Sequence, residues 1–195
     1  MRLGLTGGIA CGKSVADEFF RQQGIPVLDA DSLVHNLQGP GGLLTKAIEK
    51  AFGEGYLTQD KAVNRKKLAG LVYSDKNALQ LLNDVTQPLI RKAISNEVAK
   101  ATAPLAVFDI PLLFEQNYEG LFDKTLVIAA PKDQQLQRLM DRDGLDEAQA
   151  LRRIASQMPL AEKISRADYV IMNDGSRELF LQRLANFLQE LEGLR

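Results

Sequence analysis

Residues 7–14 read GGIACGKS, a complete match to the spacing G-x-x-x-x-G-K-[ST]. A short apolar run at residues 2–6 precedes this segment, and residues 15–22 show the apolar spacing of an amphipathic helix. The glycines allow the backbone to wrap around an anion, and the first N–H groups of the following helix would point at that anion. The setting between a strand and a helix therefore predicts a phosphate-binding loop in an α/β domain.

The loop carries its own candidates for binding a nucleotide and a metal ion. Lys13 is predicted to reach the β- and γ-phosphates, and the Ser14 hydroxyl is predicted to hold Mg²⁺. The thiol of Cys11 either has a lowered pKa at the helix N-terminus or simply fills a tight turn. The expected nucleotide-binding residues are Gly7, Gly8, Ile9, Ala10, Cys11, Gly12, Lys13, Ser14, Val15 and, after the last predicted strand, Asn173.

Composition excludes several other classes of protein. The chain has 195 residues, enough for one globular domain with insertions, and its net charge of -1 offers no electrostatic argument for a nucleic-acid or membrane surface. No apolar run approaches the roughly 18 residues that a membrane span needs, and a single cysteine excludes an internal disulfide framework. We expect a cytoplasmic protein with no nucleic-acid, membrane or obligate protein partner.

Short apolar runs alternate with helical patterns along the chain, which is typical of βαβ units and a parallel sheet. We predict a three-layer α/β fold with a five-stranded parallel sheet, residues 1–195 forming a single domain around it. Ligands of such sheets bind at the carboxyl ends of the strands. The predicted strands are residues 2–6, 26–29, 105–110, 125–130 and 169–172.

Two stretches between the strands are predicted to be helical. Residues 32–104 are too long for a simple crossover, so we expect an inserted helical subdomain that binds a second substrate, with Pro88 ending or kinking one of its helices. Residues 132–166 carry Arg138 and Arg142 four positions apart. These arginines either close over a transferred phosphate as a lid or form an ordinary solvated face.

Carboxylates follow two of the predicted strands. In an extended chain Asp29 and Asp31 project to the same side, where Asp31 would accept the proton of an alcohol; if a helix begins here, one of them caps it instead. His35 falls one turn after Asp31, either at the site or as a solvated helical histidine. Asp109 closes an apolar strand and is expected either to help hold Mg²⁺ or to accept bonds from neighbouring N–H groups.

Together these motifs resemble the dephospho-coenzyme A kinase family, in the same order and over nearly the full length of the chain. The resemblance implies a nucleoside-monophosphate-kinase-like fold. It also implies transfer of the ATP γ-phosphate to the ribose 3′-hydroxyl of dephospho-CoA, the last step of coenzyme A synthesis, with Mg²⁺ as cofactor. The segments that carry it are residues 6–14, 29–35, 87–90, 109–115, 138–143, 153–158 and 167–173.

The resemblance further implies a role for individual residues. Asp31 is the expected base, with Lys13, Arg138 and Arg142 as the other catalytic residues and Asp109 beside the loop serine as a metal ligand. ATP is expected on the loop residues named above and on Asn173. The residues expected to bind dephospho-CoA are Asp29, Asp31, His35, Gln87, Pro111, Leu112 and Glu115.

The chain departs from the family pattern at two positions. Gln87 stands where the family usually has histidine and cannot carry a charge, and Val15 stands where a hydroxyl residue is usual. Apolar residues of the insertion, such as Leu37, Leu68 and Val72, either line a channel for the pantetheine arm or form a core. Two alternatives stay open: another small-molecule or nucleotide kinase of this fold, and a non-catalytic nucleotide switch, which the lack of an Asn-Lys-x-Asp motif disfavours.

Overall fold

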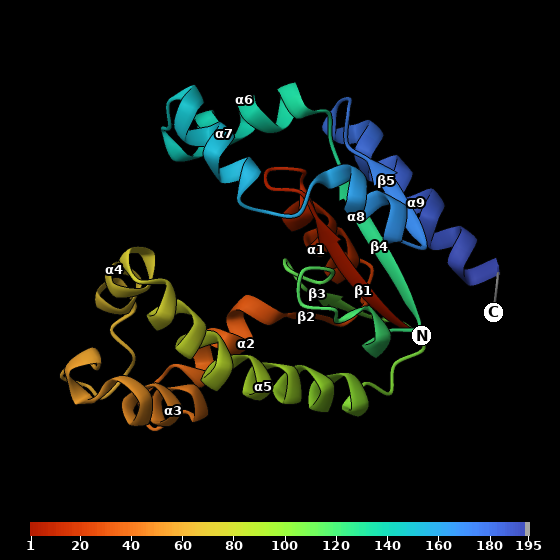
Figure 1. Ribbon diagram of the computed structural model, residues 1–195. Helices are drawn as coiled ribbons and strands as arrows, with labels where there is room; N and C mark the ends of the chain where they lie inside the picture. Colours follow the sequence, from red (N-terminus) through yellow and green to blue (C-terminus); the bar gives the residue numbers. More distant parts are fainter. Residues whose placement is uncertain (194–195) are drawn as a thin grey trace. The chain divides into compact units, whose positions relative to one another are not determined.

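A five-stranded sheet with strand order β2-β3-β1-β4-β5 organises the chain, which the computed structural model describes over residues 1–193 (Figure 1). The central strand β1 pairs in parallel with both β3 and β4, and β4 pairs in parallel with β5. The predicted five-stranded α/β fold is therefore confirmed. The strands are β1 (Arg2–Gly7), β2 (Val27–Asp29), β3 (Ala106–Asp109), β4 (Lys124–Ala129) and β5 (Tyr169–Met172).

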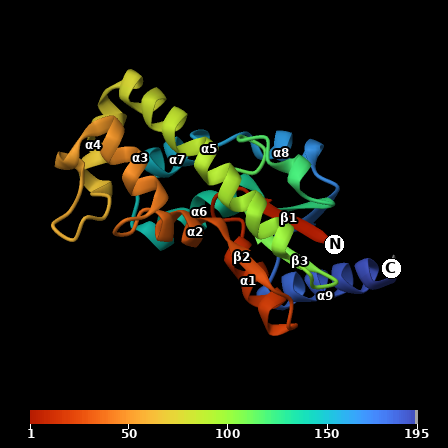
Figure 2. The same cartoon turned by 90° about the horizontal axis from the view of Figure 1, so that it is seen from below.

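Continuous apolar runs explain why the inner strands β1, β3 and β4 are covered on both faces. Residues 126–129 of β4 are all fully buried, although successive side chains point to opposite faces of the sheet. One face packs against α1 (Lys13–Gln22) and α9 (Arg177–Gly193), which lie side by side (Figure 2). Phe20 of α1 and Leu184 of α9 are fully buried in that shared core.

Three helices occupy the segment between β4 and β5. They are α6 (Lys132–Asp143), α7 (Glu147–Ala155) and α8 (Leu160–Arg166). Gly144 ends α6 in the left-handed conformation, and Asp146 begins α7 with a full capping box. These end signals are local to the sequence, so this segment folds as three short helices rather than one long one.

The chain divides into two compact units, the second of which comprises Asp29–Lys100. That unit has a core of its own, formed by Leu44, Ile48, Val63 and Leu68. Leu37 and Val72 pack against this core, so Leu37, Leu68 and Val72 contribute to a core, the second of the two alternatives given for them. Its helices are α2 (Ala30–Leu37), α3 (Leu43–Phe52), the 3₁₀ helix η1 (Glu54–Tyr56), α4 (Arg65–Ser74) and α5 (Lys76–Lys100).

Helix α5 continues through Pro88 instead of ending beside it. A proline inside a helix removes one backbone donor, which weakens the helix locally. Helix α5 packs against both α3 and α4, and Leu82 before the proline and Leu89 after it contact the core of this unit. Tertiary packing thus outweighs the local signal here.

Candidate active site

The phosphate loop follows β1 with the conformation that its glycines permit. Gly12 has φ +97°, and a Cβ atom added there would lie 2.3 Å from the side-chain nitrogen of Asn173. At Gly7 an added Cβ atom would lie 2.6 Å from the backbone oxygen of Ile128. Side chains are therefore excluded at both positions, by strain and contact at Gly12 and by contact with β4 at Gly7.

Asn173 supports the loop from the end of β5. Its side chain is buried and donates a hydrogen bond to the Cys11 carbonyl at 2.9 Å, while its backbone N–H donates to the Ala129 carbonyl at 2.7 Å. The structure thus brings this predicted nucleotide-binding residue against the loop. Its amide group holds the loop backbone in position.

Cys11, in the middle of the loop, has a buried thiol. Burial raises its pKa to about 11, although hydrogen bonds with the backbone of Ala130 and Gly8 act in the opposite direction. The suggestion of a lowered thiol pKa is therefore wrong, and the alternative, a small residue that fills a tight turn, fits the structure.

Three charged side chains meet beside the loop. The Lys13 ammonium lies 2.6 and 2.5 Å from the two carboxylate oxygens of Asp109, which is almost fully buried at the end of β3. Asp17, one turn further along α1, lies beside the same carboxylate. Burial, together with a hydrogen bond to Asp109 and its charge, raises the pKa of Asp17 to about 8. Lys13 thus pairs with the Asp109 carboxylate, and the raised pKa of Asp17 favours the protonated form of that side chain at neutral pH.

Asp17 is a site residue that sequence reasoning missed. A single acidic residue in a helix is usually solvated, and nothing in the loop motif refers to it. The available signal was its spacing: it lies four residues after Lys13, so both side chains project from the same face of α1. That spacing becomes informative only once Asp109 is known to lie opposite.

The donors at this corner suit a hard cation such as Mg²⁺. They are the exposed hydroxyl of Ser14 and the carboxylate of Asp109, with the carboxyl group of Asp17 beside them as a further ligand once it loses its proton, and oxygen ligands are what Mg²⁺ prefers. The buried Oδ1 atom of Asp17 has no hydrogen-bond partner within residues 1–193, as expected of a group placed for a cation or its water. In the described chain no cluster of three or more His, Cys, Asp or Glu residues could hold a metal ion, so nucleotide oxygens would have to complete the coordination.

The two predicted lid arginines have different environments. Arg138 donates through Nη2 to Gln134 at 2.8 Å and to the Asn173 carbonyl at 3.2 Å, while its buried Nη1 atom has no partner among the residues described. Arg142 is more exposed and forms a double hydrogen bond with Asp143, at 2.7 and 3.1 Å. A buried guanidinium nitrogen with free donors next to the loop is a suitable place for an anion, so Arg138 is the better candidate of the two.

The segment after β3 is tied to α8 by a buried ion pair. Lys163 is fully buried, and its ammonium lies 2.7 Å from Oε1 of Glu115 and 3.2 Å from the Pro111 carbonyl. The same Oε1 atom accepts a hydrogen bond from the Met158 N–H at 3.2 Å. Leu112 in this segment is exposed. Two residues expected to bind substrate, Pro111 and Glu115, thus hold this part of the structure together.

The remaining predicted acceptor residues belong to the second unit. Asp29 is the N-cap of α2 and accepts hydrogen bonds from the Asp31 N–H at 2.9 Å and the Ser32 hydroxyl at 2.7 Å. The expectation of an extended chain over these carboxylates is wrong, because a helix begins directly after Asp29 and the capping alternative holds. His35 lies four residues after Asp31 on α2 and so shares its helix face, and Gln87 lies within α5.

The fold and the site together define a P-loop nucleotide-binding protein of the small-molecule kinase class. The features that define this class are the loop lysine Lys13, the buried carboxylate of Asp109 at the end of β3, and the Arg138 Nη1 donor, which has no partner among the described residues. The sequence model of the dephospho-CoA kinase family matches residues 1–178. The chain therefore belongs to the dephospho-CoA kinase family, a family of ATP-dependent kinases.

Individual relatives agree with this assignment. The dephospho-CoA kinase of Lactobacillus johnsonii is 42% identical over 192 residues, covering 97% of both chains, and that of Latilactobacillus sakei is 44% identical over 190 residues, covering 96% of this chain and 94% of the other. The solved dephospho-CoA kinase from Campylobacter jejuni superimposes with a TM-score of 0.76 at 33% identity, covering 100% of this chain and 98% of that one. Within residues 1–193, no helix is long and apolar enough to cross a membrane.

Proposed function

We propose that this chain transfers the γ-phosphate of ATP to the ribose 3′-hydroxyl of dephospho-CoA, and that its partners are these two small molecules. The observation that carries the proposal is the phosphate loop of a chain in the dephospho-CoA kinase family, with Lys13 paired to Asp109 and with an Arg138 Nη1 donor that has no partner within residues 1–193. A cytoplasmic location stays a prediction.

The nucleotide end of the reaction depends on the loop and its lysine. Backbone N–H groups at the start of α1 would bind the phosphates with the favourable end of the helix dipole. Lys13 would leave Asp109 for the β- and γ-phosphates, and Arg138 would bind phosphate oxygens through its free donor. Charge that develops on the transferred group is then met by positioned cations.

Ser14 and Asp109 would hold Mg²⁺, with Asp17 beside them. When bound, the ion neutralises charge on the β- and γ-phosphates. These residues supply hard oxygen donors, and Asp109 is positioned by the end of β3. The magnesium requirement is a proposal that rests on the chemistry of these donors.

Asp31 would orient the acceptor hydroxyl and accept its proton, assisted by Asp29, His35 and Gln87. We assign residues 32–104 to acceptor binding and residues 132–166 to a lid that excludes water during transfer. In this assignment Arg142 of α6 would exchange Asp143 for a phosphate oxygen when the lid closes.

The test is ADP release from Mg-ATP with dephospho-CoA, adenosine, AMP, CMP, shikimate or water as acceptor. We expect turnover with dephospho-CoA and a 3′-phosphorylated product. Asp31→Asn should keep ATP affinity and lose most turnover, whereas Asp60→Asn, an exposed acid of the same unit, should change neither. Turnover with another acceptor only would refute the substrate assignment, and an active Asp31→Asn variant would remove Asp31 from the role of base.

A further inference from the structure

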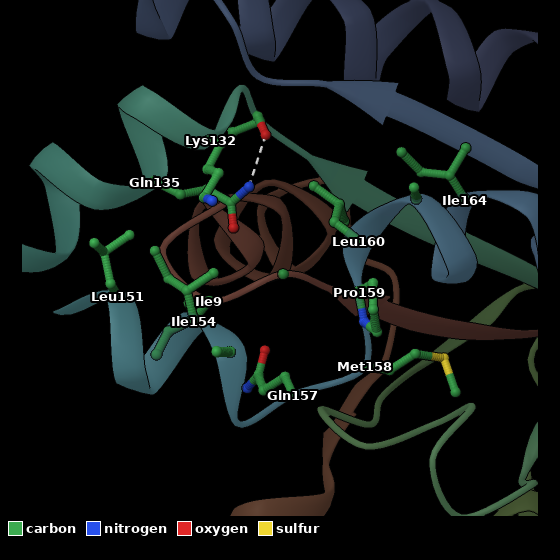
Figure 3. A pocket seen from close by; sticks show the side chains of 14 residues that line it. Ile9, Lys132, Gln135, Leu151, Ile154, Gln157, Met158, Pro159, Leu160 and Ile164 are labelled. Atoms are coloured by element: carbon green, nitrogen blue, oxygen red, sulfur yellow. Dashed lines mark hydrogen bonds between the residues drawn. The ribbon is translucent and has the colours of Figure 1, made fainter. Parts of the chain in front are cut away.

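An open cavity of about 860 Å³ lies beside the phosphate loop and is lined in part by residues of α6, α7 and α8 (Figure 3). Its walls are mainly aliphatic, and the labelled side chains Ile9, Leu151, Ile154 and Leu160 face into it in the close view. Every lining residue belongs to the first unit, so its shape does not depend on the second. The volume is in the range of roughly 300–1,000 Å³ that small-molecule sites occupy.

The cavity adjoins the phosphate loop. Gly8 and Ile9, which line it, form the first half of the loop. ATP is expected on the whole loop, with Val15 near the α-phosphate and Lys13 at the β- and γ-phosphates. A ligand in the cavity would therefore lie beside the phosphates that the loop binds, and the acceptor must approach the γ-phosphate there.

The side chains that line the cavity suit an aliphatic part of the acceptor better than its adenine ring. No aromatic side chain lines the cavity in the described part of the chain, so an adenine ring would find no stacking partner there. Aliphatic side chains dominate, and the amides of Gln135 and Gln157 and the ammonium of Lys132 lie among them. The Gln135 amide nitrogen already donates to the Ala130 carbonyl at 2.8 Å, which leaves its oxygen for a ligand N–H group (Figure 3).

We propose that this cavity binds the pantetheine arm of dephospho-CoA, an aliphatic chain interrupted by two amides; this inference rests on the proposed function. The gem-dimethyl and methylene groups of the arm would contact Ile154, Leu151 and Leu160, and its amides would bond with Gln135 and Gln157. In the second unit, Leu68 belongs to the core, and Leu37 and Val72 pack against it. The lid segment thus holds part of the acceptor as well as covering the phosphate.

A substitution that fills the cavity tests this assignment. Ala155 lines the cavity at the end of α7 and is exposed, so Ala155→Leu adds an aliphatic group without disturbing a buried position. Ala148→Leu makes the same change on the same helix at an exposed position outside the cavity, and is the matched control. Unchanged melting temperatures of both variants would show that each one folds.

Ala155→Leu should raise the KM for dephospho-CoA about tenfold or more, as one misplaced methylene can do in an apolar site, and leave the KM for ATP within about twofold. The inhibition constant of AMP against dephospho-CoA at saturating ATP should stay unchanged, because AMP has the adenosine without the arm. An unchanged KM for dephospho-CoA, a matching rise for ATP, or an equal loss for AMP would each overturn the assignment. Failure of the proposed function itself would appear separately, as absence of turnover of dephospho-CoA by the unaltered enzyme.

Discussion

The buried pair of Lys163 and Glu115 should contribute strongly to stability. Lys163 is 0% exposed and Glu115 17% exposed, so neither charge is well solvated. The pair joins the segment after β3 to α8, and Glu115 also accepts from the Met158 N–H. We expect Glu115→Gln to destabilise the fold, because it leaves the ammonium buried with only neutral oxygen acceptors around it.

The size of this effect follows from the burial of Lys163. Breaking a buried pair from one side costs about 3–5 kcal/mol, and glutamine keeps an acceptor oxygen, so we expect the lower end, about 3 kcal/mol. In a chain of 195 residues each kcal/mol shifts the melting temperature by about 2–4 °C, which predicts a fall of roughly 6–12 °C. Urea denaturation would give the free energy of unfolding directly.

A second ion pair between the same two segments provides the control. Arg166 of α8 contacts Glu119, and their side chains are 30% and 37% exposed. Because exposed pairs contribute about 0–1 kcal/mol, Glu119→Gln should cost less than about 1 kcal/mol. In the double variant with Lys163→Met, the Glu115→Gln cost should largely disappear, since no buried charge is left unpaired. A cost for Glu115→Gln below 1 kcal/mol, or strict additivity in the double variant, would refute the reasoning.

Three further predictions concern single positions. Burial raises the pKa of Cys11 to about 11, against 9.0 for a free thiol, so the fraction of thiolate falls about 100-fold. Iodoacetamide should therefore label the native protein slowly at pH 7.5 and the urea-unfolded protein readily. Burial acts to raise the pKa of Asp168, but hydrogen bonds from Lys124 and Thr125 outweigh burial and lower the pKa. The contribution of Asp168 to the free energy of unfolding is therefore present above about pH 4 and lost on acidification. The difference in free energy of unfolding between wild type and Asp168→Asn, measured by denaturation, should shrink from pH 6 to pH 3. Gly12→Ala should abolish ATP binding in calorimetry, because its Cβ atom would collide with the side chain that holds the loop.

The sequence predicts the elements whose causes are local. The loop could be assigned from its glycines, lysine and serine, and the strand ending at Asp109 from four apolar residues and a carboxylate. Helix capping by Asp29 was one of two interpretations, because the same three residues suit an extended chain or a helix start, and only the backbone that follows decides. Local patterns thus give the elements and leave their junctions ambiguous.

Contacts between distant residues could not be predicted in this way. Lys163 reads as one of several charged residues of a short helix, and its full burial depends on Glu115, 48 positions earlier. The environment of Asp17 could not be predicted for the same reason, because it depends on Asp109 at the end of β3, far along the chain. Charged residues at helical spacing are usually solvated, so the exceptions are found only when the opposing element is in place.

The Pro111 carbonyl connects the phosphate site to the lid segment. It accepts hydrogen bonds from the Thr6 hydroxyl at 3.1 Å and from Lys163 at 3.2 Å, so the residue before the phosphate loop and the middle of α8 are held to one atom. Helix α8 also forms a wall of the aliphatic cavity through Leu160. Because the loop, the segment after β3 and the cavity wall share this anchor, weakening the Lys163 pair would disturb the acceptor cavity as well as the free energy of unfolding.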